Sequence, residues 1–251
     1  VHSHNSHIYA FLELAKQKTN KLGNGAFGEV YKVQVETPVK RLIAMKHQLL
    51  TSDNHDESAS EIFINKLLAG KQNIGQMLDY YIFLAPKHKE IKNGSSTMYL
   101  QMELGDRSLE QELKSPTGLF DSPVKAINIF KNVLIGLKEM HTLGISHNDI
   151  NPKNVVFFNN VAKIIDFGNS KLSGEGKRKK NNPTTKANFP AEQYDCIKTT
   201  SMTEYFDIKD AGKILFEMLF SDLSKFEEES RVYILPTGTD EVVAKILIKC
   251  F

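Results

Sequence analysis

Three polar residues in the second half of the chain have the types and spacing that phosphoryl transfer requires. Asn154 follows Asp149 by five residues, and Asp166 follows Asn154 by twelve. Phosphoryl transfer needs a carboxylate that holds the acceptor hydroxyl, and oxygen ligands for magnesium ions between the β- and γ-phosphates. One Asp, a nearby Asn and a second Asp beyond a short hairpin could supply that set. The alternative is a loop whose polar residues only satisfy one another.

A glycine-rich segment near the start of the chain could cover phosphates. Residues 22–30 read Leu-Gly-Asn-Gly-Ala-Phe-Gly-Glu-Val and contain G-x-G-x-x-G-x-V. A dinucleotide site uses the same glycine spacing but needs the glycines to lead into a helix, whereas Val30 to Val35 continues as a strand. A glycine loop between two strands favours a phosphate-covering loop, although a plain glycine-rich hairpin would share the pattern.

A lysine on the next predicted strand has a candidate partner on a helix. Ile43-Ala44-Met45-Lys46 follows at the distance that an adjacent antiparallel strand needs, and Glu61 lies fifteen residues beyond Lys46. Glu57 is an alternative partner, but Glu61 leads the apolar stripe of its helix and should point inward. Lys46 could then bind phosphates, while a lone lysine on a strand is otherwise a solvated charge.

Hydrophobic spacing places these residues on a strand-rich half followed by a helical half. Strands are predicted over 31–35, 41–46, 77–84 and 97–104, with an intervening helix over 58–69. Helices are predicted from Pro123 to Gly144 and over 207–220, and Asn159-Asn160 predicts a tight hairpin between strands 155–158 and 161–165. We therefore expect an α+β fold whose two parts meet near Leu104.

The composition excludes several other classes of protein. Apolar residues make up 41% of the 251 residues and charged residues 25%, as in average globular proteins. No apolar run approaches the length of a membrane span, and the two cysteines, Cys196 and Cys250, support neither a disulfide framework nor a zinc site. The net charge of +2 gives no direct sign of nucleic acid or membrane as a partner. We expect a cytoplasmic or nuclear protein of unspecified oligomeric state.

Taken together, the motifs resemble the eukaryotic protein kinase superfamily from Leu22 to about Phe220. The resemblance implies a bilobal fold, with an antiparallel N-lobe sheet and one main helix over 1–104 and a mostly helical C-lobe over 105–251. It also implies that a nucleotide binds between the lobes, and that the γ-phosphoryl group of ATP passes, with Mg²⁺, to Ser or Thr hydroxyls of a protein substrate.

The resemblance assigns roles residue by residue. Asp149 would be the catalytic base, Asn154 and Asp166 the metal ligands, and Lys46 and Glu61 an ion pair. Nucleotide binding would involve Leu22, Gly23, Gly25, Gly28, Val30, Ala44, Lys46, Met102, Glu103, Leu104 and Val156. Further positions that match the family are Thr185, which would touch the catalytic loop, Glu192 of the A-P-E segment, Asp207 and Gly212 of a D-x-x-x-x-G helix, and the stacked pair His147 and Phe167.

Several positions depart from the family pattern. Asn148 replaces the arginine that holds an activation-segment phosphate, so we expect constitutive activity or control by a partner. Asn151 replaces a lysine that steadies the γ-phosphate, and Lys153 is the candidate substitute. Asn65 is polar at a spine position, which indicates either a shifted helix register or a weak spine. The basic run Lys177 to Lys180 is either a solvated loop tip or a site for acidic substrates or a polyanion.

Some positions favour different classes of kinase, and the end of the chain departs from the family pattern. Asn148 and Asn151 favour a pseudokinase alternative, and an Asn before the Asp is also similar to choline and aminoglycoside kinases. Segments 61–70 and 102–109 are weakly similar to casein kinase one and vaccinia-related kinases. No arginine follows Glu192 where the family places its ion-pair partner, so we expect a truncated or abbreviated C-lobe.

Overall fold

A computed structural model of the chain describes residues 20–25, 28–35, 41–51, 53–83, 96–115, 123–172, 201–220, 241 and 245–246. Their contacts divide the chain into two units. One contains the residues up to Ala69 together with Gly75–Gly105, and the other contains Gly70–Ile74 together with the residues from Asp106 onward. The predicted lobe boundary between 104 and 105 stays a prediction. The grouping of Gly70–Ile74 with the second unit was not foreseen from the sequence.

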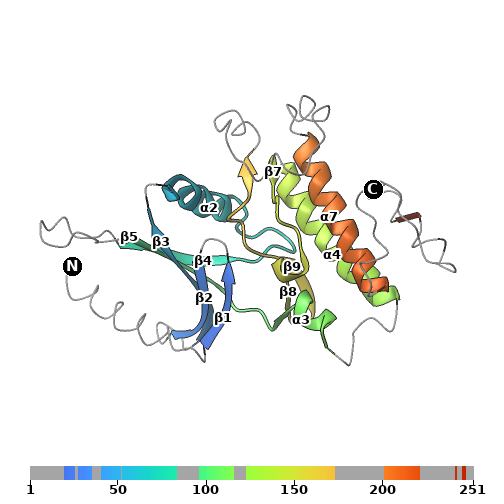
Figure 1. The fold of residues 1–251 in the computed structure, drawn as a ribbon, viewed down its shortest axis with the longest axis horizontal. Helices are drawn as coiled ribbons and strands as arrows, with labels where there is room; N and C mark the ends of the chain where they lie inside the picture. Colours follow the sequence, from blue (N-terminus) through green and yellow to red (C-terminus); the bar gives the residue numbers. More distant parts are fainter. Residues whose placement is uncertain are drawn as a thin grey trace, which may run out of the picture. The chain divides into compact units, whose positions relative to one another are not determined.

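The first unit is built on an antiparallel sheet. Its strands are β1 (Lys21–Gly25), β2 (Gly28–Val35), β3 (Arg41–Leu50), β4 (Met77–Phe83) and β5 (Ser96–Glu103), in the spatial order β1-β2-β3-β5-β4 (Figure 1). All four strands predicted for this half are present. Strand β3 continues four residues beyond its predicted end at Lys46, because Gln48 and Leu50 are buried there as well.

The two faces of β3 pack against different groups. Ile43 and Met45 belong to one apolar cluster, whereas Leu50 belongs to a second cluster that includes Ile62 of helix α2 (His55–Leu67). Since side chains alternate along a strand, Lys46 and Gln48 share the face of Leu50, on the side of α2. This register determines which polar residues of β3 can meet the helix.

Helix α2 begins three residues before its predicted start and ends two residues before its predicted end. Its start follows Asn54, whose side chain accepts the Thr51 N–H (2.8 Å) and donates to the Leu49 carbonyl (2.8 Å). Gly70, the predicted stop, has φ of 74°, a conformation that glycine adopts without a steric penalty.

The second unit contains two long helices and short strands. Its elements are β6 (Arg107–Ser108), α3 (Leu109–Leu113), α4 (Pro123–Thr142), β7 (Ile145–Ser146), the 3₁₀ turn η2 (Pro152–Asn154), β8 (Val155–Phe158), β9 (Val161–Ile164), β10 (Lys171–Leu172) and α7 (Ser201–Phe220). Helices α4 and α7 lie side by side (Figure 1). None of the helices in the described part of the chain is both long and apolar enough to cross a membrane.

Sequence patterns located most of these elements. Helix α4 starts at the predicted Pro123, and Gly144 follows it with φ of 67°. The β8–β9 hairpin turns at Asn159 and Asn160, both with positive φ, as a tight two-residue connection requires. Helix α7 starts at Ser201, six residues earlier than predicted.

The segment Gly70–Ile74 is bound into the second unit by hydrogen bonds of Asn73. The Asn73 side-chain Nδ2 donates to the Ala162 carbonyl (2.9 Å), and the Ile164 N–H donates to the Asn73 backbone carbonyl (2.9 Å). Gly136 of α4 allows this approach, because a Cβ there would lie 2.8 Å from the Asn73 carbonyl oxygen. A short piece of chain thus fixes α4 and β9 together.

Candidate active site

In the first unit, Lys46 and Glu61 form a buried ion pair. The Lys46 Nζ lies 2.6 Å from the Glu61 Oε1, and both side chains are 3% exposed. The pairing agrees with the prediction that chose Glu61 over Glu57. Because desolvation offsets much of the attraction within a buried pair, such a pair is a poor source of stability. It does, however, hold the lysine ammonium in one place.

Asn65, one turn beyond Glu61, is the polar residue for which the sequence allowed either a shifted helix register or a weak spine. It is buried, and its side-chain amide donates to the Glu61 carbonyl (2.9 Å). Glu61 still meets Lys46, so the helix register is not shifted. The polar residue is accommodated by a hydrogen bond within its own helix.

The glycine segment joins two strands, as predicted, rather than leading into a helix. Strands β1 and β2 pair through Gly25 and Gly28, and residues 26–27 lie outside the described part of the chain. Gly28 has a structural need to be glycine, because a Cβ there would lie 2.2 Å from the His47 carbonyl oxygen. Around Gly23, by contrast, a Cβ would meet nothing within 4 Å, which leaves open space beside this part of the loop.

A charge cluster braces the same hairpin. The Lys21 Nζ lies 2.6 Å from the Glu29 Oε1, and the Tyr31 hydroxyl donates to Glu29 (2.7 Å). Two hydrogen bonds lower the pKa of Glu29, the larger effect coming from Lys21 and the smaller from Tyr31. The pKa of Tyr31 is raised, mainly because its hydroxyl donates to that carboxylate.

Asp149 is held by two asparagine amides in the second unit. Asn151 Nδ2 donates to one carboxylate oxygen of Asp149 and Asn154 Nδ2 to the other, both at 2.9 Å. Each amide also donates to the Asp149 carbonyl (3.1 and 2.9 Å). The carboxylate is therefore fixed in orientation by two neutral donors.

Asn151 has a structural role in this loop that the sequence interpretation undervalued. Its Oδ1 accepts the N–H groups of Lys153 (2.9 Å) and Asn154 (3.3 Å) at the start of the η2 turn, with Pro152 in the first position. An Asn followed by a Pro is a recognisable capping signal, and it could have been found in the sequence. Lys153 itself is exposed, and its role as a substitute for the missing lysine stays a prediction.

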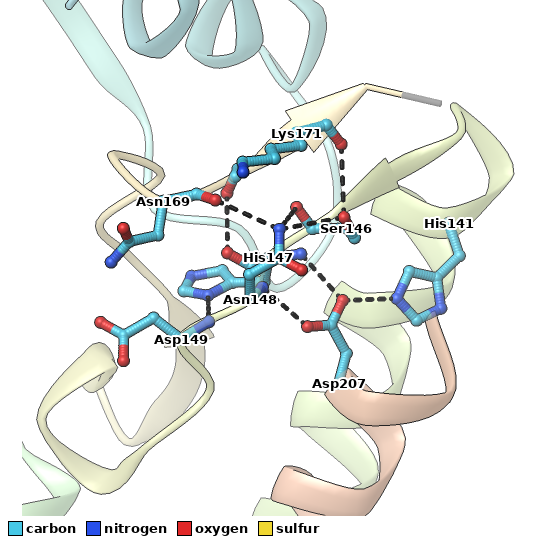
Figure 2. Close-up of polar contacts among 9 residues, drawn as sticks. His141, Ser146, His147, Asn148, Asp149, Asn169, Lys171 and Asp207 are labelled. Atoms are coloured by element: carbon cyan, nitrogen blue, oxygen red, sulfur yellow. Dashed lines mark hydrogen bonds and ion pairs between the residues drawn. The ribbon is translucent and has the colours of Figure 1, made fainter. Parts of the chain in front are cut away.

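A fully buried carboxylate anchors the start of this loop (Figure 2). Asp207 of α7 is 0% exposed and accepts the backbone N–H groups of His147 and Asn148, both at 2.8 Å. Its Oδ2 also lies 2.9 Å from the His141 Nε2, which must carry the proton of this contact. The predicted anchoring role of Asp207 is confirmed by these contacts, whereas His141 was not predicted.

His147 links the loop to the strand that leads to Asp166. The Asp149 N–H donates to the His147 Nδ1 (3.2 Å), so the Nε2 carries the proton that points to the Ile165 carbonyl (3.1 Å). The His147 ring also meets the Phe167 ring edge-to-face, with centroids 5.7 Å apart, as the predicted stacking requires. Asp166 has φ of 63°, a left-handed conformation that few non-glycine residues other than Asn and Asp adopt.

Asn148 uses its side chain within the loop. The amide donates to the Ser146 Oγ (3.1 Å) and to the Asn169 carbonyl (3.1 Å), and the residue has φ of 63°, which asparagine tolerates well (Figure 2). Strand β10 also pairs with β7 next to these contacts. The residue that replaces the expected arginine thus ties the loop that carries Asp149 to the chain just after Asp166.

The remaining predicted site residues fall into three groups. Ala44 is buried, while Val30, Val156 and the 102–104 segment are half-buried and Leu22 is exposed. Glu103 accepts the Gln76 N–H with its Oε1 (2.8 Å) and donates its own N–H to the Gln76 carbonyl (3.0 Å). Thr185, Glu192 and the basic run 177–180 lie outside the described residues. The assembly of the two units into one nucleotide site stays a prediction.

The oxygen donors of the second unit suit magnesium. The described residues contain no group of three or more His, Cys, Asp or Glu side chains that could hold a metal ion by themselves. Magnesium usually takes one or two protein carboxylates together with phosphates and waters. The Asn154 Nδ2 donates to Asp149, so the side-chain oxygen is the atom that a metal ion would contact. The Ile165 N–H also donates to the Asn154 backbone carbonyl (2.9 Å), which ties Asn154 to the Asp166 segment. The donor set fits Mg²⁺.

Comparison with known proteins identifies the family. The protein kinase domain family matches residues 16–245. The chain belongs to this family. The kinase domain is 30% identical over 172 residues to the serine/threonine-protein kinase MPS1 of Saccharomyces cerevisiae, covering 66% of this chain and 20% of that protein. It is 30% identical over 226 residues to an Aurora kinase of Eremothecium gossypii (88% and 57%) and 29% identical over 168 residues to the dual specificity protein kinase TTK of Mus musculus (65% and 17%).

Family membership tests two of the predictions made from the sequence. The predicted superfamily and the α+β kinase fold are confirmed, with the antiparallel sheet in one unit and the long helices in the other. The chain spans less than two thirds of the length of these three relatives.

Proposed function

We propose that this domain is an active protein kinase that transfers the γ-phosphoryl group of Mg-ATP to Ser or Thr hydroxyls of protein substrates. The observation that carries the proposal is the Asp149 carboxylate, with one asparagine amide on each oxygen. A carboxylate held in one orientation can accept the proton of an acceptor hydroxyl as phosphoryl transfer proceeds. The similarity to a protein named as a serine/threonine-protein kinase, MPS1, supports Ser/Thr as the acceptor class.

Each proposed role follows from a local arrangement. Glu61 fixes the Lys46 ammonium, which would bind nucleotide phosphates, and the oxygens of Asn154 and Asp166 would hold the metal. Bound Mg²⁺ would neutralise charge on the β- and γ-phosphates. Asp207 holds the backbone at His147 and Asn148, so that Asp149 starts from a fixed point.

Independence from activation-segment phosphorylation is the second part of the proposal. The Asn148 amide is neutral and cannot form the charge-assisted, bidentate bonds with which arginine binds a phosphate. Its contacts to Ser146 and Asn169 instead connect the loop directly to the start of that segment. Treating the purified protein with a phosphatase should leave its activity unchanged, and loss of activity would contradict this part.

The basic run Lys177 to Lys180 supports acidic protein substrates as the preferred class. Phosphorylation of acidic peptides should then accelerate at low ionic strength, while that of neutral peptides should not. Equal salt dependence for both peptides would rule out this preference.

A transfer assay distinguishes the proposal from its alternatives. The protein is incubated with γ-labelled Mg-ATP and either casein, histone or amino-alcohol acceptors, beside Asp149→Asn, Asp166→Asn and the matched control Asp210→Asn. We expect label in protein, lost in the first two variants and retained in the control. Label only in amino alcohols would indicate a small-molecule kinase. Thermal stabilisation by ATP without any transfer would indicate a pseudokinase.

A further inference from the structure

Polar side chains between β3 and α2 continue beyond the Lys46–Glu61 pair. We call this row of residues, which are Lys46, Gln48, Asn54, Ser58 and Glu61, the polar seam. We propose that Gln48, Ser58 and Asn54 are positioning residues that hold α2 in the register in which Glu61 meets Lys46. The inference rests on the proposed kinase function, because it concerns the ion pair of that site. It implies that the pair is assembled without a bound partner.

Two side-chain contacts, here called rungs, join β3 to α2 in this seam: Lys46 with Glu61, and Gln48 with Ser58. Lys46 and Gln48 lie two residues apart on one face of β3, and their partners Glu61 and Ser58 lie three residues apart on α2. The Gln48 Nε2 donates to the Ser58 Oγ at 2.9 Å, and both residues are 3% exposed. The residue number increases along β3 from the first rung to the second, whereas it decreases along α2. The strand and the helix therefore run in opposite directions at these contacts.

Two contacts constrain a helix in a way that one cannot. A single ion pair between flexible side chains allows the helix to rotate about its axis or slide along the strand. A second buried contact, about one turn away, fixes both the rotation and the translation. Glu61 is then presented to Lys46 by the helix as a whole.

Hydrogen bonds continue from this second rung to the beginning of the helix. The Ser58 hydroxyl donates to the Asn54 carbonyl (2.8 Å). The Asn54 side chain in turn donates to the Leu49 carbonyl at the end of β3 and accepts the Thr51 N–H. The N-terminal end of α2 is therefore joined to the strand that carries Lys46 through a closed set of hydrogen bonds.

Packing alone does not explain Gln48. Its Oε1 is buried and has no hydrogen-bond partner among the described residues, so the position retains a polar atom at a cost. An apolar pair of similar shape would avoid that cost. A directional contact, which specifies one register of α2, accounts for the polar pair.

The test combines Gln48→Leu and Ser58→Ala with a Glu61→Gln background. Steady-state kinetics of casein phosphorylation and thermal unfolding are measured for each variant, with Ser60→Ala of the same helix as the matched control. In the wild-type background we expect kcat/KM for ATP to fall about three- to tenfold, the range that the loss of one net hydrogen bond allows. In the Glu61→Gln background the same substitutions should change kcat/KM little while still shifting the melting temperature.

Other results would overturn the inference. An equal fall in kcat/KM in both backgrounds would show that the seam only supports the fold, and no fall in the wild-type background would show that it has no role. If a single variant fails to fold, the Gln48→Leu/Ser58→Ala double variant replaces both polar partners and should fold. It should still show the lower kcat/KM, and full activity in this variant would contradict positioning.

A separate measurement keeps the inference distinct from the proposed function. If the wild-type protein transfers no phosphoryl group, the proposed function fails. The position of α2 can then be followed by acetylation of the Lys46 amine with acetic anhydride and mass spectrometry. Gln48→Leu should increase Lys46 acetylation as Glu61→Gln does, and unchanged acetylation in Gln48→Leu would refute the inference.

Discussion

Replacing Asp207 by Asn tests the central anchor of the loop that carries Asp149. The carboxylate is fully buried and accepts three hydrogen bonds, from the backbone of His147, the backbone of Asn148 and the ring of His141. An asparagine can turn its oxygen toward His147 and His141, but its NH₂ group then faces the Asn148 N–H. One contact is lost outright, and the other two lose their charge.

The size of the effect follows from these contacts. A lost hydrogen bond to a buried charged group costs about 1.5–3 kcal/mol, and neutral bonds are roughly half as strong as charge-assisted ones. Together the lost bond and the two weakened bonds predict a loss of about 3–6 kcal/mol from the free energy of unfolding. Since domains have only about 5–15 kcal/mol in total, the variant should be clearly less stable yet still able to fold.

Urea denaturation followed by far-UV circular dichroism measures this loss. The matched control is Asp210→Asn, which makes the same chemical change three residues later on α7. We expect destabilisation in Asp207→Asn alone, together with reduced phosphoryl transfer at a temperature where both variants are folded. A loss below about 1 kcal/mol, or one equal to that of the control, would refute the anchoring argument.

The other predictions concern single residues with defined surroundings. Burial raises the pKa of Asp210, against the opposing effect of Lys213, so the folded state favours the protonated form. The melting temperature of Asp210→Asn relative to wild type should therefore increase as pH rises from about 4 to 7, and a pH-independent difference would contradict this. Gly28→Ala should destabilise the protein by about 1–3 kcal/mol, because its Cβ would meet a backbone carbonyl at 2.2 Å and its φ is 152°. Gly23→Ala should cost much less in the same urea titration, and equal losses would show that contact with β3 is not the cause. Gly136→Ala should also destabilise, since a backbone carbonyl 2.8 Å from the new Cβ outweighs the gain in helix propensity of about 1 kcal/mol; a more stable variant in thermal unfolding would contradict it.

Local patterns were enough to predict much of the first unit. The alternation over residues 31–35 and the apolar run that ends at Lys46 predicted two adjacent strands, and the apolar stripe of α2 selected Glu61 rather than Glu57. These features depend on the periods of a strand and a helix, which a sequence displays directly. The Asn159-Asn160 turn is similar, because tight hairpins demand positive φ and asparagine tolerates it.

Contacts between distant segments could not be predicted in the same way. Asn73 bonds to Ala162 across 89 positions, and no periodicity in either segment indicates the partner. His141 and Asp207 are separated by 66 positions and meet only because α4 packs on α7. The Gln48–Ser58 rung, although local, depends on two side chains whose polarity would ordinarily predict solvent exposure.

Three asparagines explain how the loop around Asp149 is ordered without the charges that the family pattern supplies. Asn148 ties the loop to Asn169, and Asn151 and Asn154 hold the Asp149 carboxylate from both sides. An amide carries both donors and an acceptor, so one side chain can bond to a carbonyl, a carboxylate and an N–H group of the same loop. The side chain of asparagine is shorter than that of arginine or lysine, so its hydrogen bonds end on residues that lie close to it in space. The loop therefore gains its order from contacts within its own unit, which is the physical reason to expect activity without a phosphorylated activation segment.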